Sequence, residues 1–224
     1  MKKITLDDFN KYSVVISCDD KSRLEIMKKA FDKAGLQMPQ KITGVNMCAI
    51  NGRSRKFGSN KHGESIAMSH LQCINMADTL GWPFVVIFED DAWPRNGAKE
   101  TLEKVLSEIP DESLVYYFGY DKLRKKGGKV LRAGQHAYVV FRDAFDLFRN
   151  AFATLGLETY AIDCIDRHYA QLAEVSSLAK TNVFVQMNIK DYKAHYSTTY
   201  LCRAYRGTKP EEGFPAYEEV MKND

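Results

Sequence analysis

The chain has 224 residues, of which 45% are hydrophobic and 27% are charged, and its formal net charge at pH 7 is +3. We therefore expect a single compact domain over 1–224, with a core over about residues 12–190 and a polar C-terminal tail over 191–224. The composition excludes a largely disordered chain, the small charge does not indicate nucleic-acid binding, and no apolar run approaches the roughly 20 residues that cross a bilayer, so we expect a soluble, cytoplasmic protein.

Short apolar runs alternate with amphipathic stretches along the first half of the chain, a pattern typical of α/β proteins. The predicted strands cover residues 12–17, 41–45 and 84–88, and the predicted helices cover 20–34 and 63–80. The unbroken apolar run 84–88 suits a central strand that is covered on both faces. Residues 46–61 are polar and contain glycine and serine, and we expect a loop there.

The second half of the chain continues this alternation. Predicted helices cover 99–109, 143–155 and 164–178, and predicted strands cover 113–118, 137–141 and 183–186. Between the first two of these strands, Gly127 and Gly128 indicate the turn of a hairpin that is rich in lysine and arginine. The whole pattern predicts a mixed, mostly parallel central sheet flanked by helices.

Three consecutive carboxylates, Glu89, Asp90 and Asp91, follow the apolar strand 84–88. Ligands of open α/β sheets bind beyond the carboxyl ends of the strands, so this is the position of a binding site. If the chain stays extended, Glu89 and Asp91 point to one side and Asp90 to the other, which would offer Mg²⁺ or Mn²⁺ two hard oxygen ligands. In the alternative interpretation, Asp90 or Asp91 caps a turn before Trp93 and the other carboxylates are solvated.

Residues 61–94 resemble glycosyltransferase family 25, the lipopolysaccharide-type galactosyltransferases. That family has a G-E-x-x-x-x-x-S-H helix followed by a strand that ends in E-D-D, and the matching residues here are Gly63, Glu64, Ser69, His70, Glu89, Asp90 and Asp91. The resemblance extends over most of residues 12–170. It includes Asp19 and Arg23 after the first strand, and the segments 114–119, 134–145 and 161–163.

The resemblance implies a GT-A-type fold, a nucleotide-sugar donor and an inverting transfer. Glu89 and Asp91 would hold Mn²⁺ or Mg²⁺ on the donor diphosphate, with His195 as a more remote ligand. Asp163 would act as the base for the acceptor hydroxyl, and Asp166 is the second candidate for that role. The other predicted binding residues frame the nucleotide or contact the donor: Ser17, Asp19, Arg23, Glu64, His70, Asp90, Trp93 and His136.

Each of these side chains also has a purely structural interpretation. Glu64 would interact favourably with a helix dipole, and His70 or His136 would be a hydrogen-bonded or packed histidine. Asp163 and Asp166 fit the N-cap and the third position of a helix. The acidic and basic residues after the first strand would cap a helix or be solvated.

The sequence therefore predicts a metal-dependent, inverting glycosyltransferase that moves a hexose, galactose from UDP-galactose, onto a sugar hydroxyl of a lipopolysaccharide or other surface glycan. Its partners would be the nucleotide sugar and an oligosaccharide or glycolipid acceptor. The basic hairpin is read either as a solvated hairpin or as a peripheral contact with the inner face of a membrane. Two other classes stay open: a Mg²⁺-dependent phosphohydrolase or nucleotidyltransferase, and a catalytically inactive glycan-binding protein.

Overall fold

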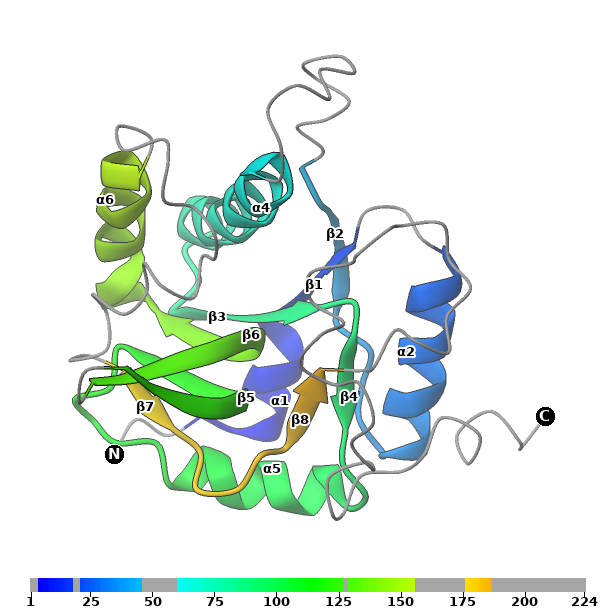
Figure 1. The fold of residues 1–224 in the computed structure, drawn as a ribbon. Helices are drawn as coiled ribbons and strands as arrows, with labels where there is room; N and C mark the ends of the chain where they lie inside the picture. The colour runs from blue at the N-terminus through cyan, green and yellow to red at the C-terminus, as the bar shows by residue number, and fades with distance from the viewer. Residues whose placement is uncertain (1–3, 18–20, 46–59, 127–128, 156–175, 187–224) are drawn as a thin grey trace.

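A six-stranded mixed sheet forms the centre of the computed structural model, which describes residues 4–17, 21–45, 60–126, 129–155 and 176–186 (Figure 1). The strand order is β2-β1-β3-β6-β5-β7. These strands are β1 (Ser13–Ser17), β2 (Gln40–Thr43), β3 (Phe84–Glu89), β5 (Val115–Lys126), β6 (Lys129–Phe141) and β7 (Ser176–Leu178). The pairs β1–β2, β1–β3 and β5–β7 are parallel, and the pairs β3–β6 and β5–β6 are antiparallel. The predicted mixed, mostly parallel sheet is confirmed.

Helices pack against both faces of this sheet. The helices α4 (Asn60–Thr79) and α6 (Phe145–Leu155) lie on one face, and α1 (Leu6–Lys11) and α5 (Ala98–Ser107) lie on the other (Figure 1). The helix α2 (Lys21–Lys33) contributes to the same core as α5, and a short 3-10 helix, η1 (Arg142–Ala144), precedes α6. Among the described helices, none combines the length and the apolar character that a membrane span requires.

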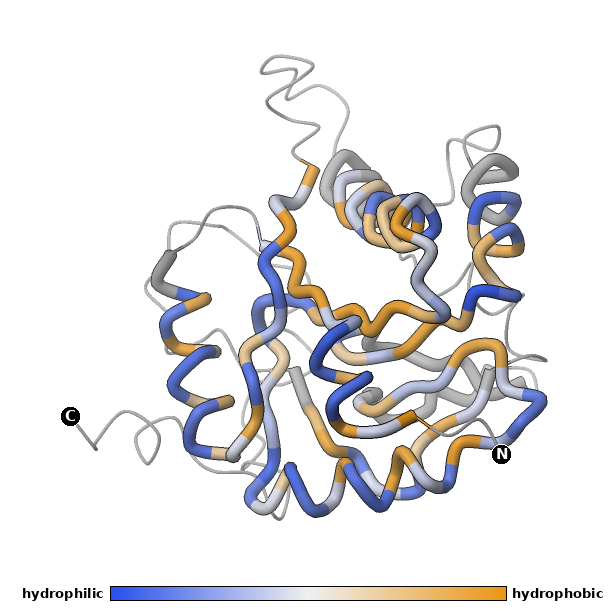
Figure 2. The backbone as a smooth tube through the Cα atoms, turned by 180° about the vertical axis from the view of Figure 1, so that it is seen from behind, coloured by the Kyte–Doolittle hydropathy of each residue, from blue (hydrophilic) through white to orange (hydrophobic). Residues whose placement is uncertain are grey.

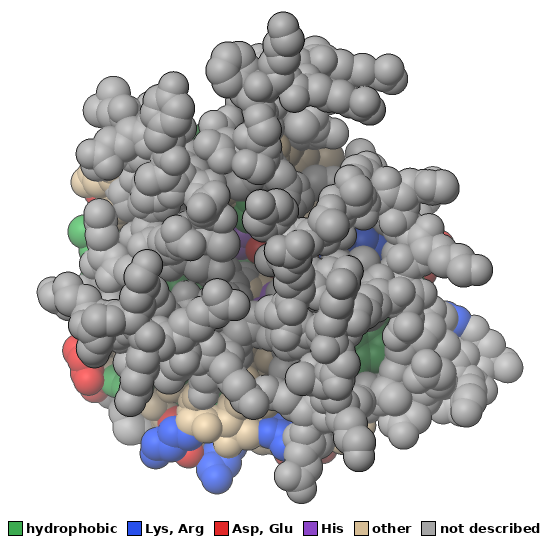
Figure 3. Space-filling view, viewed as in Figure 1, with side chains coloured by type: hydrophobic (Ala, Val, Ile, Leu, Met, Phe, Trp, Pro, Cys, Tyr) green, Lys and Arg blue, Asp and Glu red, His purple; other side chains and the backbone are tan. Residues whose placement is uncertain are grey.

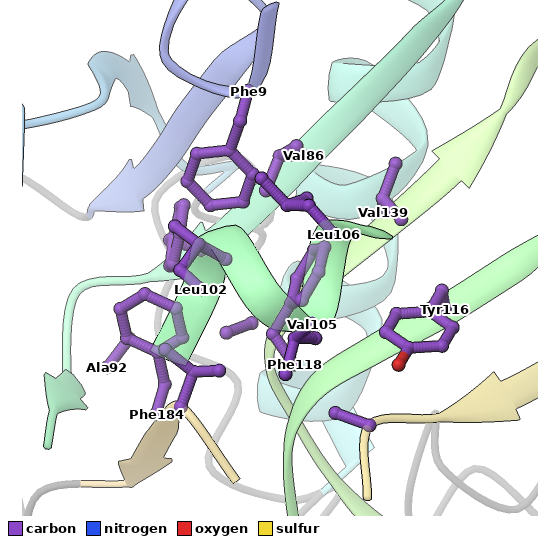
Figure 4. Close-up of a cluster of buried hydrophobic side chains, with 14 of the residues drawn as sticks. Phe9, Val86, Ala92, Leu102, Val105, Leu106, Tyr116, Phe118, Val139 and Phe184 are labelled. Atoms are coloured by element: carbon purple, nitrogen blue, oxygen red, sulfur yellow. The ribbon is translucent and has the colours of Figure 1, made fainter. Parts of the chain in front are cut away.

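The central strand β3 supplies apolar side chains to two cores, one on each face of the sheet. Val86 and Phe88 belong to the core under α5, which Figure 4 shows, whereas Val85 and Ile87 belong to the core under α4. In Figure 2, the central strands are hydrophobic along their length, whereas the helices alternate between hydrophilic and hydrophobic residues. The prediction of a central strand covered on both faces is confirmed.

A second, two-stranded sheet lies beside the carboxyl end of β3. It pairs β4 (Ala92–Pro94) with β8 (Phe184–Gln186) in antiparallel orientation, which confirms the predicted strand near residue 184. Phe184 stacks on Phe31 of α2, with ring centroids 5.7 Å apart, and meets Phe88 of β3 edge-on at 5.1 Å. The last described strand therefore closes the core on the α5 side of the sheet.

The bounds of several predicted helices and strands differ from the structure, because strands pair with partners that are distant in the sequence. The predicted helix 164–178 is wrong at its end, because Ser176–Leu178 form β7 and pair with the start of β5; the rest of that range lies outside the described residues. The hairpin strands are much longer than predicted. Their backbones form cross-strand hydrogen bonds whether the side chains are polar or apolar, so the pairing continues beyond the apolar runs. The strand β4 and the helix α1, which begins with a Thr5–Asp8 capping box, are too short for a periodic signal.

Candidate functional site

The acidic segment lies where the sequence places it, at the carboxyl ends of β1 and β3. The two strands are parallel, with Ile16 opposite Glu89, so both end at the same edge of the sheet. On the other side of β3, Phe88 is opposite Ala137 of β6, and therefore Glu89 and His136 are the next residues along the two strands. Figure 3 shows acidic and histidine side chains next to one another near the middle of the face in view.

Glu89 is held by a histidine of α4. Its Oε1 lies 3.3 Å from Nε2 of His70, and Nδ1 of His70 lies 2.6 Å from the hydroxyl of Tyr138 on β6. His70 and Tyr138 are fully buried, whereas 23% of the Glu89 side chain is exposed. The sequence motif therefore brings its histidine and its first carboxylate into direct contact, and Glu89 is the member of this group that a ligand can reach.

The charge of Glu89 is stabilised by its neighbours. Burial alone would raise the pKa of Glu89, but the hydrogen bond from His70 and the electrostatic interactions with His70, His136 and Arg23 together outweigh burial and lower it. A carboxyl group with a lowered pKa is ionised at neutral pH. Glu89 is consequently an acceptor of hydrogen bonds or a ligand for a cation, and it is not a proton donor.

Asp90 and Asp91 share a different partner, the guanidinium group of Arg23. Nη1 of Arg23 lies 2.9 Å from Oδ1 of Asp90, and Nη2 lies 3.2 Å from Oδ2 of Asp91. The chain turns directly after Glu89 instead of staying extended, so the predicted alternation of the three side chains is wrong. The interpretation with a turn before Trp93 describes the backbone correctly, although both aspartates are buried and ion-paired, not solvated.

The predicted Mn²⁺ or Mg²⁺ site is not assembled by the described residues alone. In the part of the chain that the structure describes, no group of three histidine, cysteine, aspartate or glutamate side chains is arranged to hold a metal ion. Glu89 is bound to His70, and Asp90 and Asp91 are bound to Arg23. The remaining predicted metal, base and nucleotide residues lie outside the described residues: Asp19, Asp163, Asp166 and His195.

His136 is a fully buried histidine beside Glu89. Its Nε2 lies 3.3 Å from the carbonyl oxygen of Phe184, so Nε2 carries the proton and donates a hydrogen bond to that oxygen. Nδ1 has no hydrogen-bond partner among the described residues. Burial lowers the pKa of His136, and the Glu89 charge and the Phe184 carbonyl act in the opposite direction with smaller effect. Gly119 of β5 leaves room for this contact, because a Cβ there would lie 2.5 Å from Nε2 and from the Phe184 oxygen.

The structure does not test the donor-binding roles predicted for three other residues, and it gives each of them a definite place in the fold. Ser17, at the end of β1, is buried, and its hydroxyl has no hydrogen-bond partner within the described ranges. Trp93 is only 4% exposed in β4, so stacking on a sugar would require its surroundings to move. Glu64 lies one turn inside α4, since that helix begins at Asn60, earlier than the sequence indicated.

Ser69, a further motif residue of α4, has a structural role that the sequence did not predict. Its hydroxyl donates to the carbonyl of Ser65, 2.7 Å away, and accepts the backbone N–H of Val45 at 2.8 Å. Ser69 thus connects the segment after β2 to the helix that carries His70. Tyr138 and Gly119 were also missed, because Tyr138 lies in a continuous apolar run that is typical of a core strand and Gly119 has no local signal.

Comparisons with known proteins leave the family open. No family model and no curated protein sequence matches the chain. A glycosyltransferase involved in the glycosylation of the major capsid of PBCV-1 is similar in structure, with a TM-score of 0.48 and 9% identity over 78% of this chain and 91% of that one. Mouse xyloside xylosyltransferase 1 in its apo form gives a TM-score of 0.45 and 7% identity over 75% of this chain and 84% of that one. Similarities this low do not assign a function, so family 25 and the GT-A type stay predictions.

Proposed function

We propose that the chain is an inverting glycosyltransferase that moves a hexose, galactose from UDP-galactose, onto a sugar hydroxyl of a lipopolysaccharide or other surface glycan. The observation that supports this proposal is the convergence of the motif. Arg23, His70 and the carboxylates of Glu89, Asp90 and Asp91 come from three separate segments and meet at one edge of the sheet. Open α/β sheets bind nucleotides at this edge.

The described residues suit the donor end of such a reaction. A planar guanidinium group binds phosphate oxygens through two parallel N–H groups, so Arg23 would suit the donor diphosphate once the donor displaces its contacts with Asp90 and Asp91. The ionised Glu89 is suited to accept a hydrogen bond from a sugar or ribose hydroxyl. During transfer, the acceptor oxygen attacks the anomeric carbon, the bond from that carbon to the diphosphate breaks, and UDP leaves with the electron pair. We propose that Asp163 is the base that takes the proton of the acceptor hydroxyl, with Asp166 as the second candidate for that role.

A divalent ion at Glu89 and Asp91, with His195, belongs to the proposal but requires a change in the contacts described above. Asp91 would have to leave Arg23, or ligands from outside the described residues would have to complete the site. When bound, Mn²⁺ or Mg²⁺ would neutralise charge on the departing diphosphate. The acceptor would be an oligosaccharide or glycolipid, and transfer would take place on the cytoplasmic side, with a peripheral contact to the membrane as part of the proposal.

UDP release from a panel of UDP-sugars tests this proposal. The protein is incubated with an oligosaccharide acceptor and with either Mn²⁺ or a chelator, alongside Glu89→Gln and Asp91→Asn. We expect turnover of one UDP-sugar and a loss of about 100-fold in kcat in each variant. Glu103→Gln, which changes an exposed carboxylate of α5, is the control and should keep full activity.

Other products would replace the proposal with another class. Release of inorganic phosphate without sugar transfer would indicate a phosphohydrolase, and release of pyrophosphate would indicate a nucleotidyltransferase. Binding of a glycan without turnover of any UDP-sugar would indicate a catalytically inactive glycan-binding protein. Sugar transfer that is unchanged by the chelator would exclude a metal requirement and would leave the proposed transferase activity intact.

A further inference from the structure

We propose that Tyr138 is a positioning residue of the site, and that its hydroxyl fixes the ring of His70 with the proton on Nε2, where the ring holds Glu89. The position of Tyr138 supports a fixed hydrogen bond to His70. Tyr138 lies on β6, next to Tyr117 of the neighbouring strand β5, and its side chain is fully buried. The effect on Glu89 rests on the geometry alone, whereas the effect on turnover also rests on the proposed function.

The three side chains form a chain of two hydrogen bonds that runs from the core to the accessible carboxylate. The hydroxyl of Tyr138 lies 2.6 Å from Nδ1 of His70, and Nε2 of His70 lies 3.3 Å from Oε1 of Glu89. Among the described residues, this contact is the only hydrogen bond of the Glu89 side chain. Both nitrogens of His70 are thus engaged inside the protein. His70 is therefore not available to contact a donor directly, and it can act only through Glu89.

The direction of the two hydrogen bonds follows from the chemistry of the groups. An ionised carboxylate only accepts hydrogen bonds, so Nε2 of His70 must donate to Glu89. A neutral imidazole carries one proton, which leaves Nδ1 as an acceptor. The group that faces Nδ1 is a phenol, which can donate. Without that hydroxyl, Nδ1 would be a buried acceptor with a lost partner, and the ring would no longer favour one orientation.

Aromatic stacking holds the hydroxyl of Tyr138 in this place. The rings of Tyr117 and Tyr138 stack with centroids 5.5 Å apart and an interplanar angle of 26°. The rings of Tyr138 and His70 stack in turn at 5.7 Å and 22°. Two strands and one helix thus contribute one ring each to a single column on the α4 side of the sheet. The column keeps its packing when the hydroxyl alone is removed, so Tyr138→Phe is a specific probe.

The first measurement is the nitrogen spectrum of His70 by NMR at pH 8, which does not depend on any substrate. The chain has five histidines, and the spectrum of His70→Gln identifies the signals of His70 by their loss. We expect a proton on Nε2 and a hydrogen-bonded, unprotonated Nδ1. In Tyr138→Phe we expect the Nδ1 signal to shift toward that of an unbonded acceptor. Tyr12→Phe removes a hydroxyl at the opposite end of β3 and should leave both signals unchanged.

The second measurement is a double-mutant cycle on turnover of the UDP-sugar. Tyr138→Phe should lower kcat by about tenfold and leave KM for the donor within about twofold. In His70→Gln, the side-chain amide can still donate a hydrogen bond to Glu89, but the nitrogen Nδ1 that the Tyr138 hydroxyl contacts is gone. Adding Tyr138→Phe to this variant should therefore change kcat by less than about twofold.

Three outcomes would overturn the proposal. The first is a proton on Nδ1, or on both nitrogens, in the natural protein. The second is a His70 spectrum that does not change in Tyr138→Phe. The third is an equal loss of kcat from Tyr138→Phe in both backgrounds, since it would show that Tyr138 does not act through His70. If no UDP-sugar is turned over, the proposed function fails and the NMR measurement alone decides the role of Tyr138.

Discussion

At the scale of single residues, the most constrained charge in the site is Arg23. Only 24% of its side chain is exposed, and its two terminal nitrogens contact two different, nearly buried aspartates. Removing one partner of a buried ion pair leaves the other charge without compensation, which costs far more than losing a pair on the surface. Arg23 is therefore expected to matter for stability as well as for binding.

Arg23→Gln should lower the free energy of unfolding by about 3 kcal/mol, because Asp90 and Asp91 would remain buried without their cation. Urea unfolding of both proteins measures the difference. Lys28→Gln is a matched control in the same helix, since Lys28 pairs with Asp32 on the exposed surface, and it should cost no more than about 0.5 kcal/mol. Equal costs for the two variants would contradict this account of the site.

Sequence reasoning identified these residues better than their partners. The motif named both His70 and Glu89 as site residues, and the structure brings them into contact. The pairing of Arg23 with Asp90 and Asp91 was not predicted, because it depends on a turn that an alternating strand pattern does not reveal. Tyr138 looked like an ordinary core residue, since nothing local indicates that its hydroxyl faces a histidine 68 positions earlier in the chain.

At the scale of elements, α4 positions the site. It carries His70 toward β3, and it receives the backbone N–H of Val45 through Ser69. At its C-terminal end, Asp78 binds Arg142 and Arg149, which lie in η1 and α6. Contacts at the middle and at the C-terminal end therefore fix the helix relative to the sheet, and the position of His70 follows from them.

Ser69→Ala should lower the free energy of unfolding by about 1–2 kcal/mol, because the partly buried N–H of Val45 loses its acceptor. The expected local sign is faster amide hydrogen exchange at Val45. Ser107→Ala removes a comparable side-chain bond to a helix carbonyl, but on the exposed surface of α5, and should change stability by less than about 0.5 kcal/mol. Unchanged exchange at Val45 would show that Ser69 does not hold this segment.

The sequence predicted the long elements of the fold and missed the short ones. The helices α2, α4 and α5 carry periodic apolar residues over ten or more positions, and the periodicity identified them. The strand β7 has three residues that continue a helical pattern, and only its pairing with β5 makes it a strand. Local periodicity does not contain that information.

At the scale of the whole molecule, the order of the strands decides where the site lies. The apolar run of β3 predicted a central strand, but it could not reveal that β6 would be the antiparallel neighbour that brings His136 beside Glu89. Two packed cores meet along β3, so the carboxylate at its end is fixed by both. The charge of Glu89 is accordingly coupled to the stability of the fold.

Glu89→Gln should reduce the stability of the protein at neutral pH and have less effect in acid. Burial acts to raise the pKa of Glu89, but its interactions with His70, His136 and Arg23 lower it below its ordinary value of 4.5. The ionised group therefore stabilises the folded state above pH 4.5, and this contribution is lost as the pH falls through the lower folded pKa. Unfolding measured from pH 7 down to pH 3 tests this, and a difference that grows in acid would contradict it.

The late position of β8 in the chain has a consequence for synthesis on the ribosome. Phe31 and Phe88 emerge early, but Phe184, which packs against both, is added almost one hundred residues after Phe88. The antiparallel partner of β3 also arrives late, at residues 137–141. During this interval the nascent chain presents an apolar strand with one edge unpaired, a form prone to aggregation. Release of the chain before residue 137 would leave β3 in that state, and release before Phe184 would leave the rings of Phe31 and Phe88 without this partner.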